Sequence, residues 1–412
     1  MKRSHRLVTG VPLQRKCLLL FSLIAPVLIL SLVLAAALGQ SRLLLSRESS
    51  YSAAGQLPRY LPKLAYLISG TRGEGARLRR LLQAVYHPSN FYVVHIAASP
   101  DEWADLWQYV ALEPVFRAHD NVLVMAADTV SEKGPTVVAF TLHAVAILLR
   151  KSENWDWFIN LNAADYPLMP QDDLIHIFSY LPRDLNFIGH TSKIGWKEFE
   201  RVRPVIVDPA LYDSNKTEVF WAKEKRSVPS SFKLFVGPPW MVLTRSFLEF
   251  CIWGWDNLPR TLLLYYTNFL SSSESYFHTV ICNSQEFQNT TVNHGLRFMS
   301  WGNPPQHQPL PLGLHHFDLM VESGAPFAHK LLPDDALLDR IDRQLLRQAD
   351  GRFTPGGWYR NGSTVGVRRR GRGRSRGVRY QPILRPTVGS ARLERLLVKL
   401  LDPEQFRAQQ CE

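Results

Sequence analysis

The sequence predicts an α/β protein, with a mostly parallel sheet covered by helices on both faces, behind one N-terminal transmembrane helix. Two observations lead to this prediction. Short apolar runs alternate with helical patterns through the first half of the chain, which is the order of an α/β sheet. An uncharged apolar stretch, residues 17–39, is long enough to cross a bilayer as a helix.

The apolar stretch near the N-terminus favours an uncleaved signal anchor, because a cleaved signal peptide has a shorter apolar core. Five Lys or Arg residues precede it within residues 1–16, while only Arg42 and Arg47 follow closely. The positive-inside rule then puts the N-terminus in the cytoplasm. We therefore expect a cytoplasmic tail, the anchor, a stem over 40–60 and a lumenal domain over 61–360, as in a single-pass type II membrane protein.

Strands and helices are predicted in alternation after the stem. Apolar runs predict strands, and apolar residues at three- and four-residue steps predict helices. The strands are expected at 64–70, 91–99, 121–126 and 155–167, and the helices at 75–87, 102–116, 135–152 and 171–182. Sheets of this kind bind ligands at the carboxyl ends of their strands. That rule points to Ser69-Gly70, to Ala97-Ala98 and to residues 162–165.

The second half of the chain is richer in aromatic residues and proline and gives fewer clear elements. A turn and then an amphipathic helix are expected within 323–346. The folded part is predicted to end near residue 360. Beyond it, 361–412 reads as an Arg/Gly-rich tail that is disordered apart from a short helix at 393–401.

Charge is unevenly distributed in this sequence. Hydrophobic residues make up 46% of the chain, which excludes wholesale disorder, and the formal charge is +12. Residues 367–379 hold seven Arg and no acidic residue. This stretch is typical of RNA-binding tails, but a lumenal location argues against a nucleic-acid partner. A solvated segment, or one that contacts acidic glycans or lipid headgroups, fits better.

Three cysteines would face an oxidising lumen: Cys251, Cys282 and Cys411. Because their number is odd, at least one has no partner within the chain. A bridge between Cys251 and Cys282 is one pairing to consider, and the spacing does not decide it. The predicted lumenal side also carries three N-glycosylation sequons, at Asn215, Asn289 and Asn361.

Two charged residues could carry chemistry. Glu274 is the only charge in "FLSSSESYFHTVICN", residues 269–283, where a helix is expected to begin. It is either a helix-start carboxylate favoured by the helix dipole or a general base that takes a proton from a hydroxyl. Lys330 in "APFAHKL" is either a solvated charge or a point charge that pairs with a phosphate.

Seven ordered segments resemble one family. They read "AVYHPSNFYVVH", "KGPTVVAFTLHAVAILL", "WDWFINLNAADYPLMPQDDL", "SYFHTVICN", "FQNTTVNHGLRFMSWGNPPQHQPL", "MVESGAPFAHK" and "FTPGGW". The chain resembles the plant branch of the core-2/I-branching glycosyltransferase family (glycosyltransferase family 14), the β-glucuronosyltransferases that act on arabinogalactan proteins. The resemblance covers roughly Leu64 to Trp358.

The resemblance implies a GT-A-like fold and an inverting transfer from a UDP-sugar in the Golgi. The leading expectation is transfer of glucuronic acid from UDP-glucuronate to galactan side chains of arabinogalactan proteins. The family's base is a Glu just before a "(F/W)xT(V/I)" segment, which matches Glu274. One carboxylate suffices, because the UDP leaving group needs charge neutralisation more than a proton.

The resemblance also implies residues for the donor and the acceptor. The chain has no Asp-x-Asp motif, so no metal cofactor is expected. Relatives neutralise the diphosphate with an Arg and a Lys, and Lys330 matches the Lys. No Arg stands at the other position, which leaves Arg297 and His307 as candidates. Trp301 matches an aromatic that contacts the acceptor sugar, and Lys133 is a candidate cation for the donor carboxylate.

Two departures from the family keep alternatives open. Ala97 stands where relatives commonly have an Asp that helps to hold the uracil, and Glu132 stands where an aromatic is usual. The protein could therefore transfer another UDP-sugar, such as GlcNAc or xylose. It could also be a catalytically weak or non-catalytic Golgi protein that binds glycans, although the presence of Glu274 and Lys330 counts against this.

Overall fold

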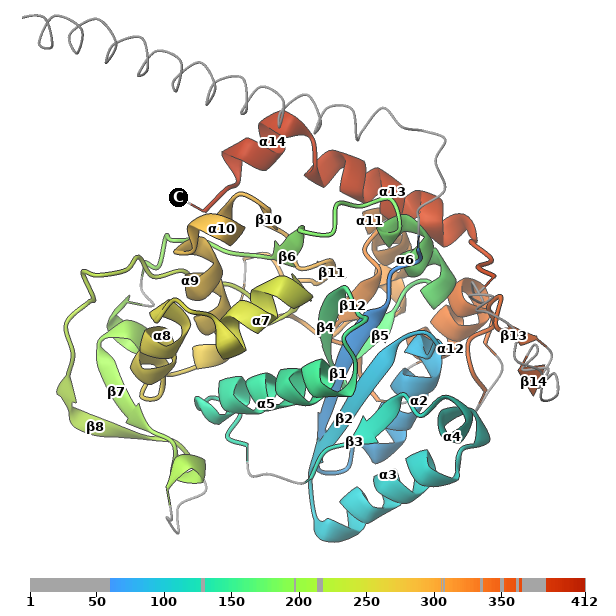
Figure 1. Ribbon diagram of the computed structural model, residues 1–412, viewed down its shortest axis with the longest axis horizontal. Coiled ribbons are helices and arrows are strands. Elements are labelled where there is room, and N and C mark those ends of the chain that lie inside the picture. The colour runs from blue at the N-terminus through green and yellow to red at the C-terminus, as the bar shows by residue number, and fades with distance from the viewer. Residues whose placement is uncertain are drawn as a thin grey trace, which may run out of the picture. The chain divides into compact units, whose positions relative to one another are not determined.

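A seven-stranded sheet forms the centre of the described part of the chain (Figure 1). The computed structural model describes residues 60–126, 130–195, 198–212, 218–304, 306, 308–333, 336–348, 352–360, 363–364 and 383–411. The predicted anchor at 17–39, with its flanking tail and stem, lies outside these residues. Within them, no helix combines the length and the apolar composition that crossing a bilayer requires.

The main sheet is mostly parallel. Its strands run in the order β10 (Thr291–Val292), β6 (Asn186–Ile188), β9 (Met241–Thr244), β4 (Trp157–Asn162), β1 (Leu64–Thr71), β2 (Phe91–Ala97) and β3 (Val122–Val124). Only β9 is antiparallel to its neighbours. The four predicted strands are confirmed as β1 to β4. Ser69 lies opposite both His95 and Asn162, so the carboxyl ends of three strands meet at one edge.

The predicted helices of the first half are also confirmed, except that one of them is split into two. They are α2 (Gly75–Val85), α3 (Pro100–Leu112), α4 (Pro114–His119), α5 (Thr136–Lys151) and α6 (Gln171–Phe178). The single helix expected at 102–116 is two helices. Pro114 has no N–H to donate and begins α4, and the Glu113 side chain accepts a hydrogen bond from Val115 N at 3.3 Å.

The second half adds short helices and small sheets. The helical elements are η1 (Glu198–Val202), η2 (Pro209–Leu211), α7 (Arg245–Trp253), α8 (Leu258–Tyr266), η3 (Ser272–Glu274), α9 (Tyr276–Cys282), α10 (Gln285–Gln288), η4 (Leu314–His316), α11 (Phe317–Ser323), α12 (Ala336–Ile341) and η5 (Asp342–Leu346). A three-stranded sheet has the order β11 (Arg297–Phe298), β12 (Phe327–His329) and β5 (Asp165–Pro167). The pairs β7 (Pro204–Val207) with β8 (Phe220–Lys225) and β13 (Tyr359–Arg360) with β14 (Ser363–Thr364) are antiparallel.

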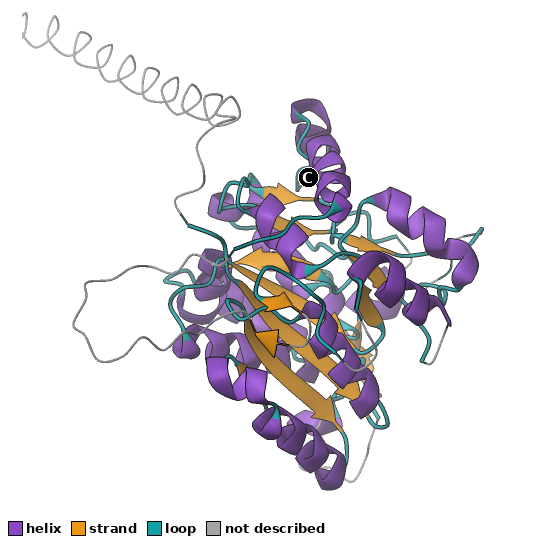
Figure 2. Ribbon diagram, turned by 90° about the vertical axis from the view of Figure 1, so that its right-hand side faces the viewer, coloured by secondary structure: helices purple, strands orange, loops and turns teal. Residues whose placement is uncertain are grey.

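Two apolar cores cover the two faces of the main sheet. Figure 2 shows helices arranged around the strands. One core packs α5, α7, α8 and α9 against the sheet, through fully buried residues such as Val145 and Phe247. The other packs α2, α6 and α12, through residues such as Leu78 and Leu174. Helices on both faces of a parallel-rich sheet are the α/β architecture that the sequence predicts.

Residues 383–411, beyond the predicted end of the folded part, are folded. Two helices, α13 (Val388–Leu400) and α14 (Pro403–Ala408), follow the Arg-rich stretch and lie across the domain in Figure 1. Leu393 and Leu397 of α13 are buried in the core beside α6. The short helix expected at 393–401 is confirmed within α13, which is longer and packed on the domain, because its amphipathic spacing gives it an apolar face to bury. We call residues 383–411 the C-terminal arm.

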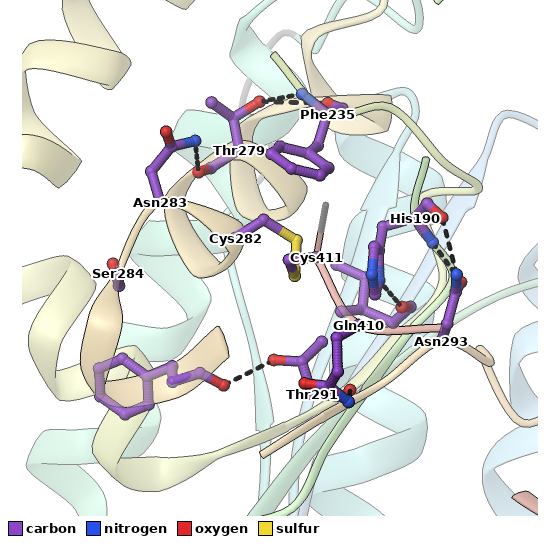
Figure 3. Close-up of a disulfide and its surroundings, with 12 residues drawn as sticks. His190, Phe235, Thr279, Cys282, Asn283, Ser284, Thr291, Asn293, Gln410 and Cys411 are labelled. Carbon is purple, nitrogen blue, oxygen red and sulfur yellow. Dashed lines mark hydrogen bonds between the residues drawn. A yellow bond between two sulfur atoms is a disulfide. The ribbon is translucent and has the colours of Figure 1, made fainter. Parts of the chain in front are cut away.

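A disulfide fixes the end of the arm. Cys282, the last residue of α9, is bonded to Cys411, and Figure 3 shows the pair beside His190 and Thr291. The pairing of Cys251 with Cys282 is thereby corrected, and Cys251 is a buried free thiol, as the odd number of cysteines requires. Sequence spacing could not reveal this bridge, because it joins residues 129 positions apart.

Candidate active site

Glu274 lies just outside the helix that follows it. It ends the one-turn helix η3, and Ser275 separates it from α9. Its backbone is held, because Gly237 N donates a hydrogen bond to Glu274 O at 2.9 Å. Its side chain is about one-third exposed, and Arg201 Nη1 forms an ion pair with its Oε2. The carboxylate is thus fixed on a turn but still partly open to solvent.

The loop at 131–136 lies against the Glu274 segment. Ser271 N donates to Lys133 O at 2.8 Å, and Ser272 Oγ donates to Gly134 O at 3.4 Å. The Lys133 side chain is exposed. The structure therefore brings one predicted cation, Lys133, next to the segment that carries the predicted base.

A buried carboxylate, Asp208, organises this loop. Its Oδ1 accepts hydrogen bonds from Ser131 Oγ at 2.5 Å and Ala210 N at 3.0 Å. Its Oδ2 accepts two from Thr136, from N at 3.2 Å and Oγ1 at 2.8 Å. A Cβ at Gly134 would collide with the same carboxylate. Sequence reasoning missed Asp208, although an Asp before a Pro is a helix-capping signal that could have indicated it.

Residues 237–241 connect the Glu274 segment to the central sheet. Pro238 O lies 3.0 Å from His278 Nε2 of α9. At the other end, Asn160 of β4 donates to Pro239 O at 2.8 Å and accepts from Met241 N at 2.9 Å. The ring of Trp240 lies 4.1 Å from that of His329, the residue before Lys330. One short segment thus reaches from the predicted base to the strand that precedes the predicted phosphate-binding lysine.

Lys330 follows β12 and is half-buried. Its carbonyl oxygen accepts a hydrogen bond from Leu312 N at 2.8 Å. The next residue, Leu331, donates from its N to Ala164 O at 2.9 Å. Ala164 belongs to the turn after β4, so Lys330 lies at the carboxyl edge of the sheet, where the strand order predicts a ligand site.

A buried cluster of Asp165, His329 and Arg297 lies next to that edge of the sheet. Asp165 Oδ2 accepts from Asn162 N at 2.7 Å, and Asp165 Oδ1 lies 3.0 Å from His329 Nδ1 and 3.4 Å from Arg297 Nε. The Arg297 guanidinium also donates to Asn160 O. Burial lowers the pKa of Arg297, and the neighbouring Asp165 carboxylate opposes that shift.

Arg297 is therefore not an open phosphate-binding residue in this structure. Its side chain has 0% exposure, and Asp165 balances its charge. This burial counts against the candidate role of Arg297, and the other candidate for that role, His307, lies outside the described residues. Asp165 lies within residues 162–165, where the strand-end rule points, but its contacts with Arg297 and His329 could not be read from the sequence, because these residues lie far along the chain.

The remaining predicted residues are less closely tied to this arrangement. Trp301 is about one-third exposed, and its carbonyl oxygen accepts from Gln306 N at 2.7 Å. Ala97 ends β2 and is half-buried, and Glu132 is exposed. Among the sequons, Asn289 is exposed, whereas Asn215 and Asn361 lie outside the described residues.

Comparisons with known proteins agree with the resemblance read from the sequence. The family model for the Core-2/I-Branching enzyme matches residues 64–321. Beta-glucuronosyltransferase GlcAT14B of Arabidopsis thaliana is 54% identical over 352 residues, which is 85% of this chain and 80% of that protein. GlcAT14C of the same plant is 52% identical over 377 residues, 89% of this chain and 91% of that protein. Human Xylosyltransferase 2 is 31% identical over 242 residues, 58% of this chain and 26% of that protein.

Proposed function

Because this chain belongs to the Core-2/I-branching enzyme family of glycosyltransferases, we propose that it moves glucuronic acid from UDP-glucuronate to galactan side chains of arabinogalactan proteins. The observation that carries this proposal is the identity of 52–54% to plant β-glucuronosyltransferases over 85–89% of the chain. The similarity to a xylosyltransferase is lower and covers less of the chain, which favours glucuronate over xylose as the donor sugar.

Glu274 is the base in this proposal. The acceptor hydroxyl oxygen forms a bond to the anomeric carbon of the donor, on the face opposite UDP. The bond from that carbon to the UDP oxygen breaks, and UDP leaves with the electron pair. The acceptor proton passes to the Glu274 carboxylate, and the anomeric configuration is inverted. A partly exposed carboxylate on a fixed turn suits this role, because a base must reach the proton that it takes.

Lys330 stabilises the leaving group in this proposal. Negative charge develops on the diphosphate as the bond breaks, and a fixed ammonium lowers the energy of that state. The position of Lys330 beside the turn after β4 supports the assignment. Lys133, next to the Glu274 segment, would face the donor carboxylate, and Trp301 would contact the acceptor sugar. The proposal includes a GT-A-like fold and transfer without a metal cofactor.

The proposed location is the Golgi membrane. The apolar stretch at 17–39, with its basic flank on the N-terminal side, supports a single-pass type II orientation with the catalytic domain in the lumen. The exposure of Asn289 is compatible with glycosylation there. A UDP-sugar and a glycan on glycoproteins would be its partners.

A donor panel tests the proposal. The full-length chain, purified in detergent, is assayed with UDP-glucuronate, UDP-xylose and UDP-GlcNAc on a galactan acceptor, with and without EDTA. We expect glucuronate transfer that survives EDTA. Transfer of xylose or GlcNAc alone would assign another donor, and no transfer from any donor would support a non-catalytic glycan-binding protein. Loss of turnover in EDTA that manganese restores would contradict the metal-free mechanism.

A further inference from the structure

The carboxylate of Glu274 is held by an arginine from a distant part of the chain. Arg201 lies on η1, and its Nη1 donates to Oε2 of Glu274. Both side chains are partly shielded from solvent, with exposures of 15% for Arg201 and 29% for Glu274. The structure gives no hydrogen bond from a described residue to the other oxygen, Oε1.

This ion pair belongs to a rigid frame. The Arg226 guanidinium ties the η1–β7 segment to the end of α8 through four carbonyl groups. They are Val202 O at 2.9 Å, Pro204 O at 3.3 Å, Tyr265 O at 3.0 Å and Asn268 O at 2.6 Å. Burial lowers the pKa of Arg226, because the charged guanidinium loses contact with water.

A second set of bonds fixes the same two segments. Ile206 N of β7 donates to Asn268 O at 3.1 Å, and Asn268 Nδ2 donates to Ile206 O at 2.9 Å. Val202 and Ile206 are fully buried. The segments that carry Arg201 and Glu274 are therefore fastened to each other independently of the ion pair. Exposed ion pairs on mobile side chains contribute little, but this one joins two groups that the backbone already holds in place.

We propose that Arg201 is a positioning residue for the base: it binds Oε2 of Glu274 and leaves Oε1 to take the proton of the acceptor hydroxyl. This inference rests on the proposed role of Glu274. A carboxylate without such a partner can rotate and present either oxygen in many directions. Displacement of a reacting group by about 1 Å can cost about 100-fold in rate, so fixing one oxygen contributes directly to turnover.

A double-mutant cycle tests the proposal on the full-length chain. Arg201→Ala should lower kcat by about 10- to 100-fold and leave the KM for UDP-glucuronate unchanged. Arg201→Lys should recover part of the loss, because an ammonium can still bind Oε2. In the Glu274→Gln background, Arg201→Ala should cause no further loss, since Arg201 acts through Glu274. Arg203→Ala, at an exposed arginine two residues along the same segment, is the matched control and should retain activity.

Four results would overturn the assignment. Equal losses from Arg201→Ala in both backgrounds would mean that Arg201 acts elsewhere. A raised KM for UDP-glucuronate with kcat retained would assign Arg201 to the donor carboxylate. Normal turnover of Arg201→Ala with an inactive Glu274→Gln would remove the positioning role and leave the base intact. Normal turnover of Glu274→Gln would remove the base itself. If Arg201→Ala lowers the melting temperature, Arg201→Gln, which retains more of the side chain without its charge, is judged by the same criteria.

Discussion

At the scale of single residues, Glu274 has two possible roles that the sequence alone does not distinguish. A carboxylate before a helix can stabilise the helix through its dipole, or it can act as a base. Here Glu274 ends η3 and Ser275 separates it from α9, whose first turn contains no acidic residue. The position gives the helix-start role little physical support.

Glu274→Gln distinguishes the two roles in one variant. The amide keeps the shape of the side chain but cannot take a proton, so transfer should fall by roughly two to four orders of magnitude. The affinity for UDP should hardly change, because the proposed mechanism puts the carboxylate on the acceptor side. The melting temperature should hardly change, because a lost charge near a helix start costs only about 0.3–1 kcal/mol. Initial rates, UDP calorimetry and thermal melting measure the three quantities. Near-normal rates would return Glu274 to a structural role.

Lys330→Ala tests the leaving-group site. Charge-assisted hydrogen bonds contribute about 1.5–3 kcal/mol, so UDP affinity should fall by about one to two orders of magnitude. Transfer should fall with it, because the diphosphate is charged in both the ground state and the transition state. Lys399→Ala, at an exposed lysine on α13, is the control. A calorimetric UDP affinity equal to that of the control would remove Lys330 from the site.

His87 makes stability depend on pH. Burial lowers the pKa of His87 to about 3, and the neighbouring His119 adds to the shift. An unfolded histidine titrates near 6.5, so between these values the unfolded chain binds a proton that the folded chain does not. His87 therefore contributes to the free energy of unfolding. This contribution is complete above about pH 6.5 and is lost as pH falls toward about 3, by up to about 1.4 kcal/mol per pH unit.

Urea unfolding between pH 7 and pH 4.5 checks this contribution. The free energy of unfolding of His87→Gln should fall less steeply with decreasing pH than that of the wild type, because the variant lacks the titrating imidazole. His143→Gln, at an exposed position on α5, should keep the wild-type slope. Parallel slopes for all three proteins would contradict the prediction.

At the scale of elements, Asp208 holds the loop that carries Lys133. Asp208→Asn leaves one carbonyl oxygen for four donors and turns an amide N–H₂ toward some of them. We expect a stability loss of about 1–3 kcal/mol and slower transfer as the loop shifts. Melting temperature and initial rate measure both effects.

Asp402→Asn is the matched control for Asp208→Asn. Asp402 also caps a helix, accepting from Glu404 N and Gln405 N, but it is exposed. Asn and Asp are equally good helix caps, so this variant should be close to wild type. If Asp208→Asn were as harmless as the control, its four hydrogen bonds would not organise the loop.

The sequence predicted the elements better than the contacts between them. The apolar runs at β1 to β4 and the helices between them follow local periodicity, so they were readable. The site residues Glu274 and Lys330 came from family motifs, and their roles remain proposals. Arg201 and Arg226 were not readable, because each acts on residues far along the chain and stands in a segment without a local pattern. Asp208 had a local capping signal, but its bonds to the loop at 131–136 were not readable.

At the scale of the whole molecule, the C-terminal arm is docked by side chains of α6. Asp172 Oδ2 accepts from Gly357 N and Arg385 N, each at 2.7 Å, and Asp173 Oδ2 accepts from Thr387 Oγ1 at 2.6 Å. Burial raises the pKa of both carboxyl groups. The Arg-rich composition before the arm led to the prediction of a disordered tail over 361–412. The arm, however, forms hydrogen bonds to the buried carboxylates of Asp172 and Asp173.

The disulfide should stabilise the protein through this arm. Cys282 and Cys411 are 129 residues apart, so the bridge restricts a long loop of the unfolded chain. Cys411→Ser should therefore cost about 2–5 kcal/mol, seen as a lower melting temperature. Wild-type protein treated with dithiothreitol should melt like Cys411→Ser, and the variant should not respond to the reagent.

Loss of this disulfide should affect the rate of transfer less than it affects stability. Cys282 ends α9, whereas Glu274 precedes it and is held by Gly237 and Arg201, with Lys133 O accepting from the nearby Ser271 N. Well below its melting temperature, Cys411→Ser should therefore transfer sugar at the wild-type rate, because none of the bonds to the base involves the arm. Initial rates measured across temperature test this. A rate loss at low temperature, where the variant is fully folded, would mean that the arm positions the base through α9.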